Sequence, residues 1–281
     1  MGRVSLGTAR HRSCLGQVPR GQPAHRGRAR LRPLVPLLVV GGLLLASTAG
    51  ALTQQLPGSD EHVNVSAGAQ TRPLGHPAPA PAQRGEFAFL HTQPGEPDQP
   101  VAYDPCRPIR VVVNNAEAPP GANRLLDEAI DTVSAATGLQ FVIDGETDER
   151  PTLGRPPTDS DRYGDGWSPV LVAWTTPAVV SRLRGTTTGL AGSSVHPDGD
   201  RLVTGIILLD GPEVRAALAL DGRRAARAVI VHELGHLVGL DHVDDPRQLM
   251  HAEGTPGITS LGAGDRHGLR ALGLGRCFPD D

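Results

Sequence analysis

The C-terminal two thirds of the sequence predict an α+β domain, and three observations lead to this fold class. Five short runs are expected to form β-strands: four are rich in branched aliphatic residues, and residues 189–195 are joined to the last of them by a His-Pro-Asp-Gly-Asp turn. A helical repeat of apolar residues lies between the first two runs. The other helical patterns follow only after the last strand. Strands first and helices afterwards, with a single strand–helix–strand start, favour α+β over a regularly alternating α/β fold.

Each element follows from a local pattern. Leu126, Ile130 and Val133 recur at helical spacing, and Gly138 is expected to end their helix. Asp221 is a suitable N-cap for the long helical stretch that comes after it. Residues 144–168 are dense in Asp, Pro and Gly and are expected to form a polar loop. The strands are expected at 109–113, 139–143, 170–174, 189–195 and 202–209, and the helices at 122–137, 223–239 and 265–272.

An uncharged apolar segment spans residues 34–52. Eight Arg precede it in a basic flank, residues 1–33, and no acidic residue occurs before Asp60. This order is typical of an export signal, with cleavage after Ala51 as one outcome. The segment is also close to the roughly 20 residues that span a bilayer, so an uncleaved anchor is the other outcome. Because positive flanks stay cytoplasmic, both outcomes place the rest of the chain on the extracellular side, anchored in the membrane or secreted.

Composition and charge divide the exported part in two. Residues 53–102 are rich in Pro, Gly, Ala and Gln, which predicts a disordered spacer. Ten of the 27 Arg and five of the 30 acidic residues lie in 1–102, which leaves 17 Arg against 25 acids in the predicted domain, 103–281. An acidic domain lacks the cationic face that phosphate contacts require, so we expect no nucleic-acid partner. No feature indicates an oligomer, and we expect a monomer.

Two of the three cysteines, Cys106 and Cys277, stand near the two ends of the predicted domain. An oxidising compartment favours a disulfide that joins such ends, and we expect one between them. The alternative is that Cys106 caps a metal as a thiolate and keeps the site latent. Cys106 directly precedes a predicted strand, which leaves little chain to reach a metal.

The motif His-Glu-Leu-Gly-His at residues 232–236 carries the chemistry. His232 and His236 are four residues apart, so on a helix both imidazoles project from one face and reach one Zn²⁺. Glu233 is one residue after His232, rotated about 100° from it, and reaches a water molecule on that metal instead. Gly239 permits a sharp turn that returns His242 as a third ligand. Three protein ligands leave one position for water, which is typical of a single catalytic zinc.

With its third histidine, the motif resembles that of the metzincin metallopeptidases, and within them the matrixin branch. Met250 stands where their methionine turn is expected, and residues 244–250 and 261–272 are also similar to matrixins. The resemblance covers roughly residues 103–277. It implies a metzincin-like domain with a five-stranded mixed sheet, an active-site helix and a C-terminal helix. It also implies that Met250 packs beneath the metal and that Asp265 braces the methionine turn.

The sequence departs from the matrixin pattern at several points. No Pro-Arg-Cys-Gly latency motif precedes the domain, and His251 stands where matrixins usually carry Tyr. No second histidine set for a structural zinc is evident. His196 with Asp198 and Asp200 offers ligand types for calcium or zinc, but the same residues suit a polar hairpin turn, which is favoured.

These features together predict an exported zinc endopeptidase that hydrolyses polypeptides with a zinc-bound water activated by Glu233. We expect the substrate to lie extended along an edge strand at residues 189–195, against Gly189, Leu190 and Ala191. The alternatives are a secreted zinc-binding module without turnover, an anchored envelope protein that only binds partners, and a hydrolase of non-peptide bonds. A module that only binds has no need of Glu233.

Overall fold

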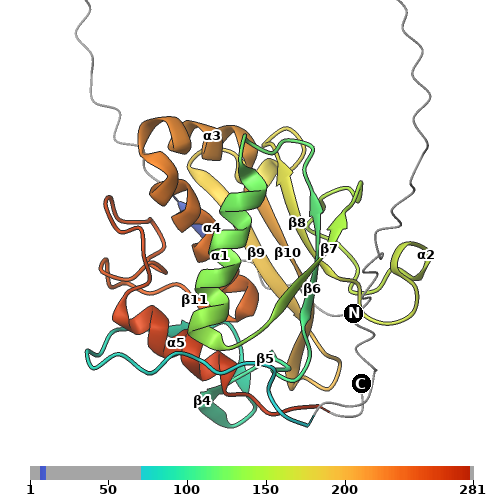
Figure 1. Ribbon diagram of the computed structural model, residues 1–281, viewed down its shortest axis with the longest axis vertical. Helices are drawn as coiled ribbons and strands as arrows, with labels where there is room; N and C mark the ends of the chain where they lie inside the picture. The colour runs from blue at the N-terminus through green and yellow to red at the C-terminus, as the bar shows by residue number, and fades with distance from the viewer. Residues whose placement is uncertain (1–6, 11–70, 279–281) are drawn as a thin grey trace, which may run out of the picture. The chain divides into compact units, whose positions relative to one another are not determined.

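The computed structural model describes residues 7–10 and 71–278, and its centre is a twisted mixed sheet (Figure 1). The five long strands have the order β7-β6-β8-β10-β9. Four of them run parallel and β9 runs antiparallel to β10, so the predicted five-stranded mixed sheet is confirmed. The bounds are β6 Ile109–Asn114, β7 Phe141–Glu146, β8 Val170–Thr175, β9 Thr187–Val195 and β10 Arg201–Asp210.

Two helices, α1 (Ala122–Thr137) and α4 (Gly222–Val238), pack on one another and cover one face of the sheet (Figure 1). The pattern that predicted α1 is the face that it buries, including Leu126 and Val133. Gly138 ends this helix with a left-handed φ of 79°. The main core lies between these helices and the sheet, because alternate side chains of each strand point to this face.

The opposite face of the sheet has a smaller core under the loops that connect β7, β8 and β9. Short helical turns occur in these loops at α2 (Ser160–Tyr163) and η1 (Ser181–Leu183). Arg155 is 6% exposed there and pairs with Glu149 at 2.7 Å. The predicted polar loop therefore contains an ion pair between a buried Arg and a partly buried Glu, which composition did not indicate.

A further helix, α3 (Gly211–Leu220), precedes α4 where the sequence predicted only one long helix. The Asp210 side chain caps it by accepting a hydrogen bond from Glu213 N, and Pro212 occupies its first turn. The final helix, α5 (Ala263–Gly273), begins two residues before its predicted start. The first difference is an additional helix, and the second concerns only a helix start. Asp221, the predicted N-cap, directly precedes α4 but its side chain makes no capping hydrogen bond.

The predicted disordered spacer is wrong for residues 71–102, which lie along the surface of the domain as an extended segment. Short strands interrupt it at β2 (Ala88–Phe89), β3 (Thr92–Gln93), β4 (Glu96–Pro100) and β5 (Ala102–Tyr103). Composition indicates whether a segment can form a hydrophobic core of its own. Residues 71–102 form none and instead pack against the rest of the domain. The domain thus begins at least 30 residues before 103, whereas residues 53–70 lie outside the described residues.

The predicted flank and signal or anchor segment, 1–33 and 34–52, also lie outside the described residues, apart from β1 (Gly7–Arg10). The backbone of β1 pairs antiparallel with β9, which would otherwise be an edge of the sheet. In the part of the chain that the structure describes, no helix is long and apolar enough to cross a membrane.

Candidate metal centre

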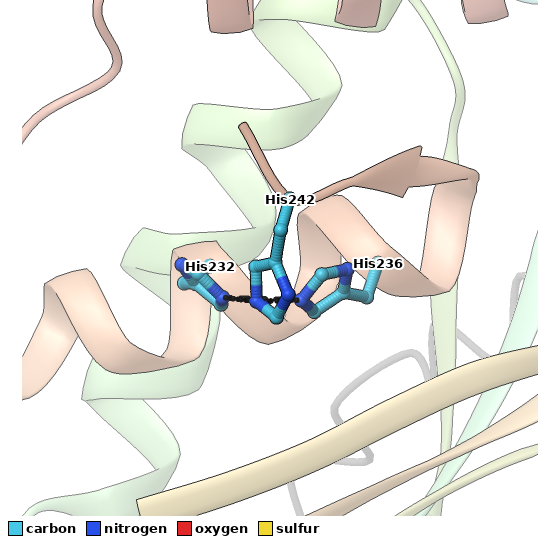
Figure 2. A group of neighbouring side chains, drawn as sticks. All are labelled: His232, His236 and His242. Atoms are coloured by element: carbon cyan, nitrogen blue, oxygen red, sulfur yellow. Dashed lines mark hydrogen bonds between the residues drawn. The ribbon is translucent and has the colours of Figure 1, made fainter. Parts of the chain in front are cut away.

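The last two turns of α4 and the turn that follows them present three histidines to one point (Figure 2). His232 and His236 project from the same face of the helix, as their spacing predicted. The helix ends at Gly239, whose φ of 123° reverses the chain. A short strand, β11 (Leu240–Asp241), then leads to His242. The glycine predicted to permit the turn is therefore where the chain direction changes.

The three Nε2 atoms lie close to the corners of an equilateral triangle. They are 3.1 Å apart for His236 and His232, 3.0 Å for His236 and His242, and 3.2 Å for His232 and His242. Two nitrogens held tetrahedrally at about 2.05 Å from zinc are separated by about 3.3 Å. The spacing therefore fits a single Zn²⁺.

The hydrogen bonds of the other ring nitrogens set the tautomers. His232 Nδ1 donates to the carbonyl of Leu249 at 2.7 Å, and His236 Nδ1 donates to that of Leu240 at 2.8 Å. Both rings consequently direct an unprotonated Nε2 at the same point, an arrangement that a cation stabilises. Burial, together with His232 and His242, lowers the pKa of His236 well below its ordinary value, and burial lowers that of His242. Neutral imidazoles are the form that binds metal.

Glu233 is fully buried beside the triad and against the backbone of β9. A Cβ atom on Gly189 would lie 2.5 Å from Glu233 Oε1. Neither carboxylate oxygen has a hydrogen-bond partner among the described residues. Burial raises the pKa of Glu233 well above its usual range. A buried carboxyl without partners is rare in proteins and is a feature of sites that receive a ligand, a water molecule or an ion.

Met250 and Asp265 connect the triad to α5. The Met250 thioether lies against α4 at Gly235, between the two helical ligands. Asp265 is 1% exposed and accepts hydrogen bonds from Leu249 N at 2.6 Å and Met250 N at 3.2 Å. The carbonyl of Leu249 accepts the hydrogen bond from His232, and Asp265 holds the amide nitrogen of the same peptide unit. Asp265 is therefore connected to the ligand His232 through one peptide unit. These contacts are the ones that the predicted methionine packing and brace require.

The other predicted ligands do not converge. His196 pairs with Asp198 at 3.4 Å, whereas Asp200 pairs with Arg201 and Arg276. The backbone of this segment forms a turn, with Gly199 N donating to His196 O. The observed pairs match the polar hairpin that the sequence favoured, and they bring no three ligands together for calcium or a second zinc.

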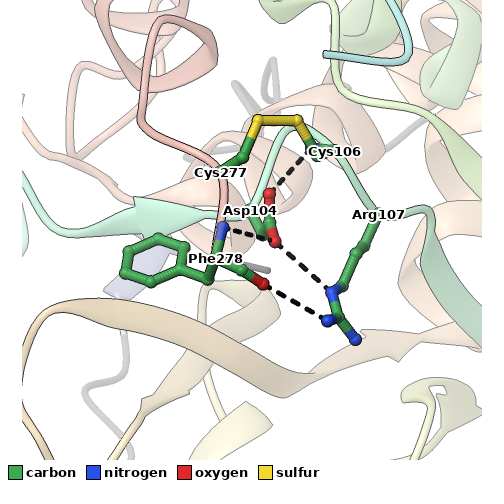
Figure 3. Close-up of a disulfide and its surroundings, with 5 residues drawn as sticks. All are labelled: Asp104, Cys106, Arg107, Cys277 and Phe278. Atoms are coloured by element: carbon green, nitrogen blue, oxygen red, sulfur yellow. Dashed lines mark hydrogen bonds and ion pairs between the residues drawn. A yellow bond between two sulfur atoms is a disulfide. The ribbon is translucent and has the colours of Figure 1, made fainter. Parts of the chain in front are cut away.

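Only one other group of three possible ligands occurs within the described residues, at the disulfide (Figure 3). Cys106 and Cys277 are bonded there, with their Cα atoms 5.4 Å apart, so the predicted disulfide is confirmed and the thiolate alternative is wrong. Asp104 accepts hydrogen bonds from the Cys106 and Phe278 backbone nitrogens, and its carboxylate pairs with Arg107. The group joins the segment just before β6 to the C-terminal segment after α5.

Sequence reasoning missed the groups that orient the ligands. The Leu240 and Leu249 carbonyls are backbone atoms, which no residue pattern reveals. Gly189 had been predicted to contact substrate as part of an edge strand, but its contact with Glu233 was missed because it depends on how α4 packs on the sheet. His251 is half-buried after Met250, with its Nδ1 3.5 Å from Thr255 Oγ1.

Comparison with known proteins finds a family match in the region of the chain that holds the metal centre. A family model described as Matrixin matches residues 185–272, which include β9, the three histidines, Met250 and Asp265. No curated protein matches the sequence. The strands and helix before residue 185 are therefore assigned by the structure.

Proposed function

The chain carries a matrixin-family zinc metalloendopeptidase domain, and from this premise we propose that Glu233 is its general base and β9 its substrate-binding strand. The observation that carries the proposal is the position of Glu233, which is buried without a partner, next to the triad and against Gly189. A carboxylate held there can serve chemistry between the metal and an extended peptide. His232, His236 and His242 are the proposed zinc ligands.

Each residue contributes a separate part of the reaction. When bound, zinc brings the pKa of a water molecule to about 7 and polarises the scissile carbonyl. Glu233 accepts the proton of the attacking water and delivers it to the leaving amine. Burial raises the pKa of Glu233, and a carboxylate with a raised pKa is a stronger proton acceptor than an ordinary one. Glu233 is fully buried, so the surrounding protein excludes solvent that would compete for that proton.

We propose that the substrate lies antiparallel to β9. The backbone register at which β9 accepts an antiparallel strand supports this, since Thr8 pairs with Leu190 and Ala9 with Gly189. These partners are residues predicted to contact substrate. Main-chain hydrogen bonds to such a strand give affinity that depends little on side chains.

We propose export as the route by which the domain meets its substrates. The basic flank and apolar segment of residues 1–52 support export, and the Cys106–Cys277 disulfide suits an oxidising compartment. If residues 34–52 span a membrane, β1 lies on one side of the membrane and the domain on the other, because β1 precedes this segment and the domain follows it. Pairing of β1 with β9 and a membrane-spanning segment are therefore alternatives within one molecule.

Cleavage of unfolded casein by the chain from residue 53 onward tests the proposal. The wild-type protein is compared with Glu233→Gln, and zinc content is measured for both. We expect about one zinc per chain in each protein and turnover in the wild type alone. Wild-type protein that binds zinc without cleaving casein would instead favour the zinc-binding module. Undiminished turnover in Glu233→Gln would refute the role of Glu233.

A further inference from the structure

We propose that residues 83–89, named the strap, position the zinc ligands His236 and His242, so that the functional domain includes a segment far upstream of its zinc motif. The inference rests on the proposed function, because it concerns the same zinc site. Its evidence is separate, since it comes from contacts between the strap and the chain around the ligands.

The strap pairs with the segment that connects the two ligands. In the antiparallel pair of β2 and β11, Phe89 faces Leu240 and Ala88 faces Asp241. Beyond the strap, Leu90 N donates to Gly239 O at 2.9 Å. Leu240 also supplies the carbonyl that accepts from His236 Nδ1. The strand pairing thus holds the peptide that sets the ring orientation of His236.

A second contact lies on the other side of His242. Glu86 Oε2 accepts a hydrogen bond from Asp245 N at 3.0 Å, three residues after the ligand. The carboxylate of Asp241, the residue before this ligand, accepts a hydrogen bond from His242 N at 2.7 Å. With Ala88 paired to Asp241, the strap holds the backbone both before and after His242. A ligand on a turn between two such supports loses little orientational freedom when it binds metal.

Two glycines allow the strap to reach this position. Gly85 crosses Gly264 at the start of α5, and a Cβ atom on Gly85 would overlap the backbone nitrogen of Gly264. A Cβ atom on Gly264 would likewise overlap the Glu86 carbonyl. Both obstacles are backbone atoms, which cannot move aside as a flexible side chain does. Any larger residue at this crossing must lift the strap from the domain.

The strap is also attached to α5 independently of the zinc ligands. His267 Nε2 donates to the Gln83 carbonyl at 3.0 Å, and the Phe87 ring stacks on His267 with 6.5 Å between centroids. Phe87 packs edge-on against Phe89 at 5.5 Å. Since α5 also carries Asp265, which braces the methionine turn, one helix supports both sides of the metal centre.

The upstream part of the same extended segment offers a matched control. A Cβ atom on Gly75 would overlap the Gly138 carbonyl, again a backbone atom. This contact is at the C-terminal end of α1 and involves neither the zinc ligands nor the strap. Gly75→Ala and Gly85→Ala therefore introduce the same methyl group and a similar clash, and only Gly85→Ala disturbs the strap.

The test is the rate at which the zinc-loaded full chain releases zinc to a chromogenic chelator. Removing groups that orient metal ligands typically costs 10–100-fold in metal affinity. We expect Gly85→Ala to release zinc at least tenfold faster than the wild type, and Gly75→Ala to release it at about the wild-type rate. The melting temperature of each zinc-free protein is measured alongside. If Gly85 had only a structural role, Gly85→Ala and Gly75→Ala would lower the melting temperature by the same amount and release zinc at the same rate.

Glu86 gives a second test that needs no backbone movement. Glu86→Ala should speed zinc release, whereas Glu86→Gln retains an acceptor oxygen for Asp245 N and should restore slow release. Equal release rates for Gly85→Ala and Gly75→Ala, with no effect of Glu86→Ala, would overturn the inference while the wild type still binds zinc. A wild-type chain that binds no zinc would overturn the proposed function itself.

Discussion

Adding one methyl group at Gly189 should displace the proposed base, Glu233, while leaving zinc binding unchanged. The Cβ atom of Gly189→Ala would lie 2.5 Å from Glu233 Oε1 and 2.7 Å from Glu233 Cδ. Ordinary contact begins at 3.4 Å, so one group must retreat by about 0.9 Å. Gly189 is held by its pairing with Leu209 in β10, whereas the Glu233 carboxylate ends a flexible side chain. We therefore expect the carboxylate to move.

The expected loss is mainly in turnover. Misplacing a reacting group by about 1 Å can cost about 100-fold in rate, equivalent to about 2.7 kcal/mol of transition-state stabilisation. The histidines are not displaced, so zinc content should stay at the wild-type value. The assay measures kcat and KM on a fluorogenic peptide, together with zinc content and thermal unfolding. Gly154→Ala is the control, because a Cβ atom there has no neighbour within 4 Å. Wild-type kcat in zinc-loaded Gly189→Ala would refute the reasoning.

Three further predictions concern stability and metal binding. Replacing Cys106 and Cys277 by Ser should lower the free energy of unfolding by about 2–5 kcal/mol, as measured in urea, because the bond closes a loop of 171 residues. Burial raises the pKa of Glu149, but hydrogen bonds from Arg155 and Tyr163 outweigh it and leave the pKa below its ordinary 4.5. The stability that Glu149 contributes is therefore present above pH 4.5 and is lost as pH falls through its lower, folded-state pKa. A pH series of unfolding curves should show that the stability of Glu149→Gln depends less on acid pH than that of the wild type. The same acid dependence in both proteins would contradict this prediction. Asp265→Ala should weaken zinc binding about 10–100-fold in chelator competition, since it frees the peptide that orients His232, and unchanged affinity would exclude that path.

The features that the sequence determined by itself are those that depend on neighbours along the chain. The helical period places His232 and His236 on one face, and Gly239 reverses the chain within one turn, so the ligand set could be predicted from spacing alone. Aliphatic runs likewise predicted β6, β8 and β10, whose side chains are almost all buried, whereas the mostly exposed β7 was expected two residues too early, at 139–143. A cysteine near each end of the predicted domain, residues 103–281, was sufficient to predict the disulfide, although the observed domain begins further upstream.

Only the tertiary structure decided which distant groups support that site. The strap was predicted to be disordered because its composition cannot form a core, yet its backbone pairs with β11 and Gly85 fits against Gly264 of α5. The Leu240 and Leu249 carbonyls that orient the histidines belong to every peptide alike and leave no mark in the residue pattern. Hydrogen bonds between backbone groups far apart in the chain are specified by how whole elements pack, and local periodicity carries no information about them.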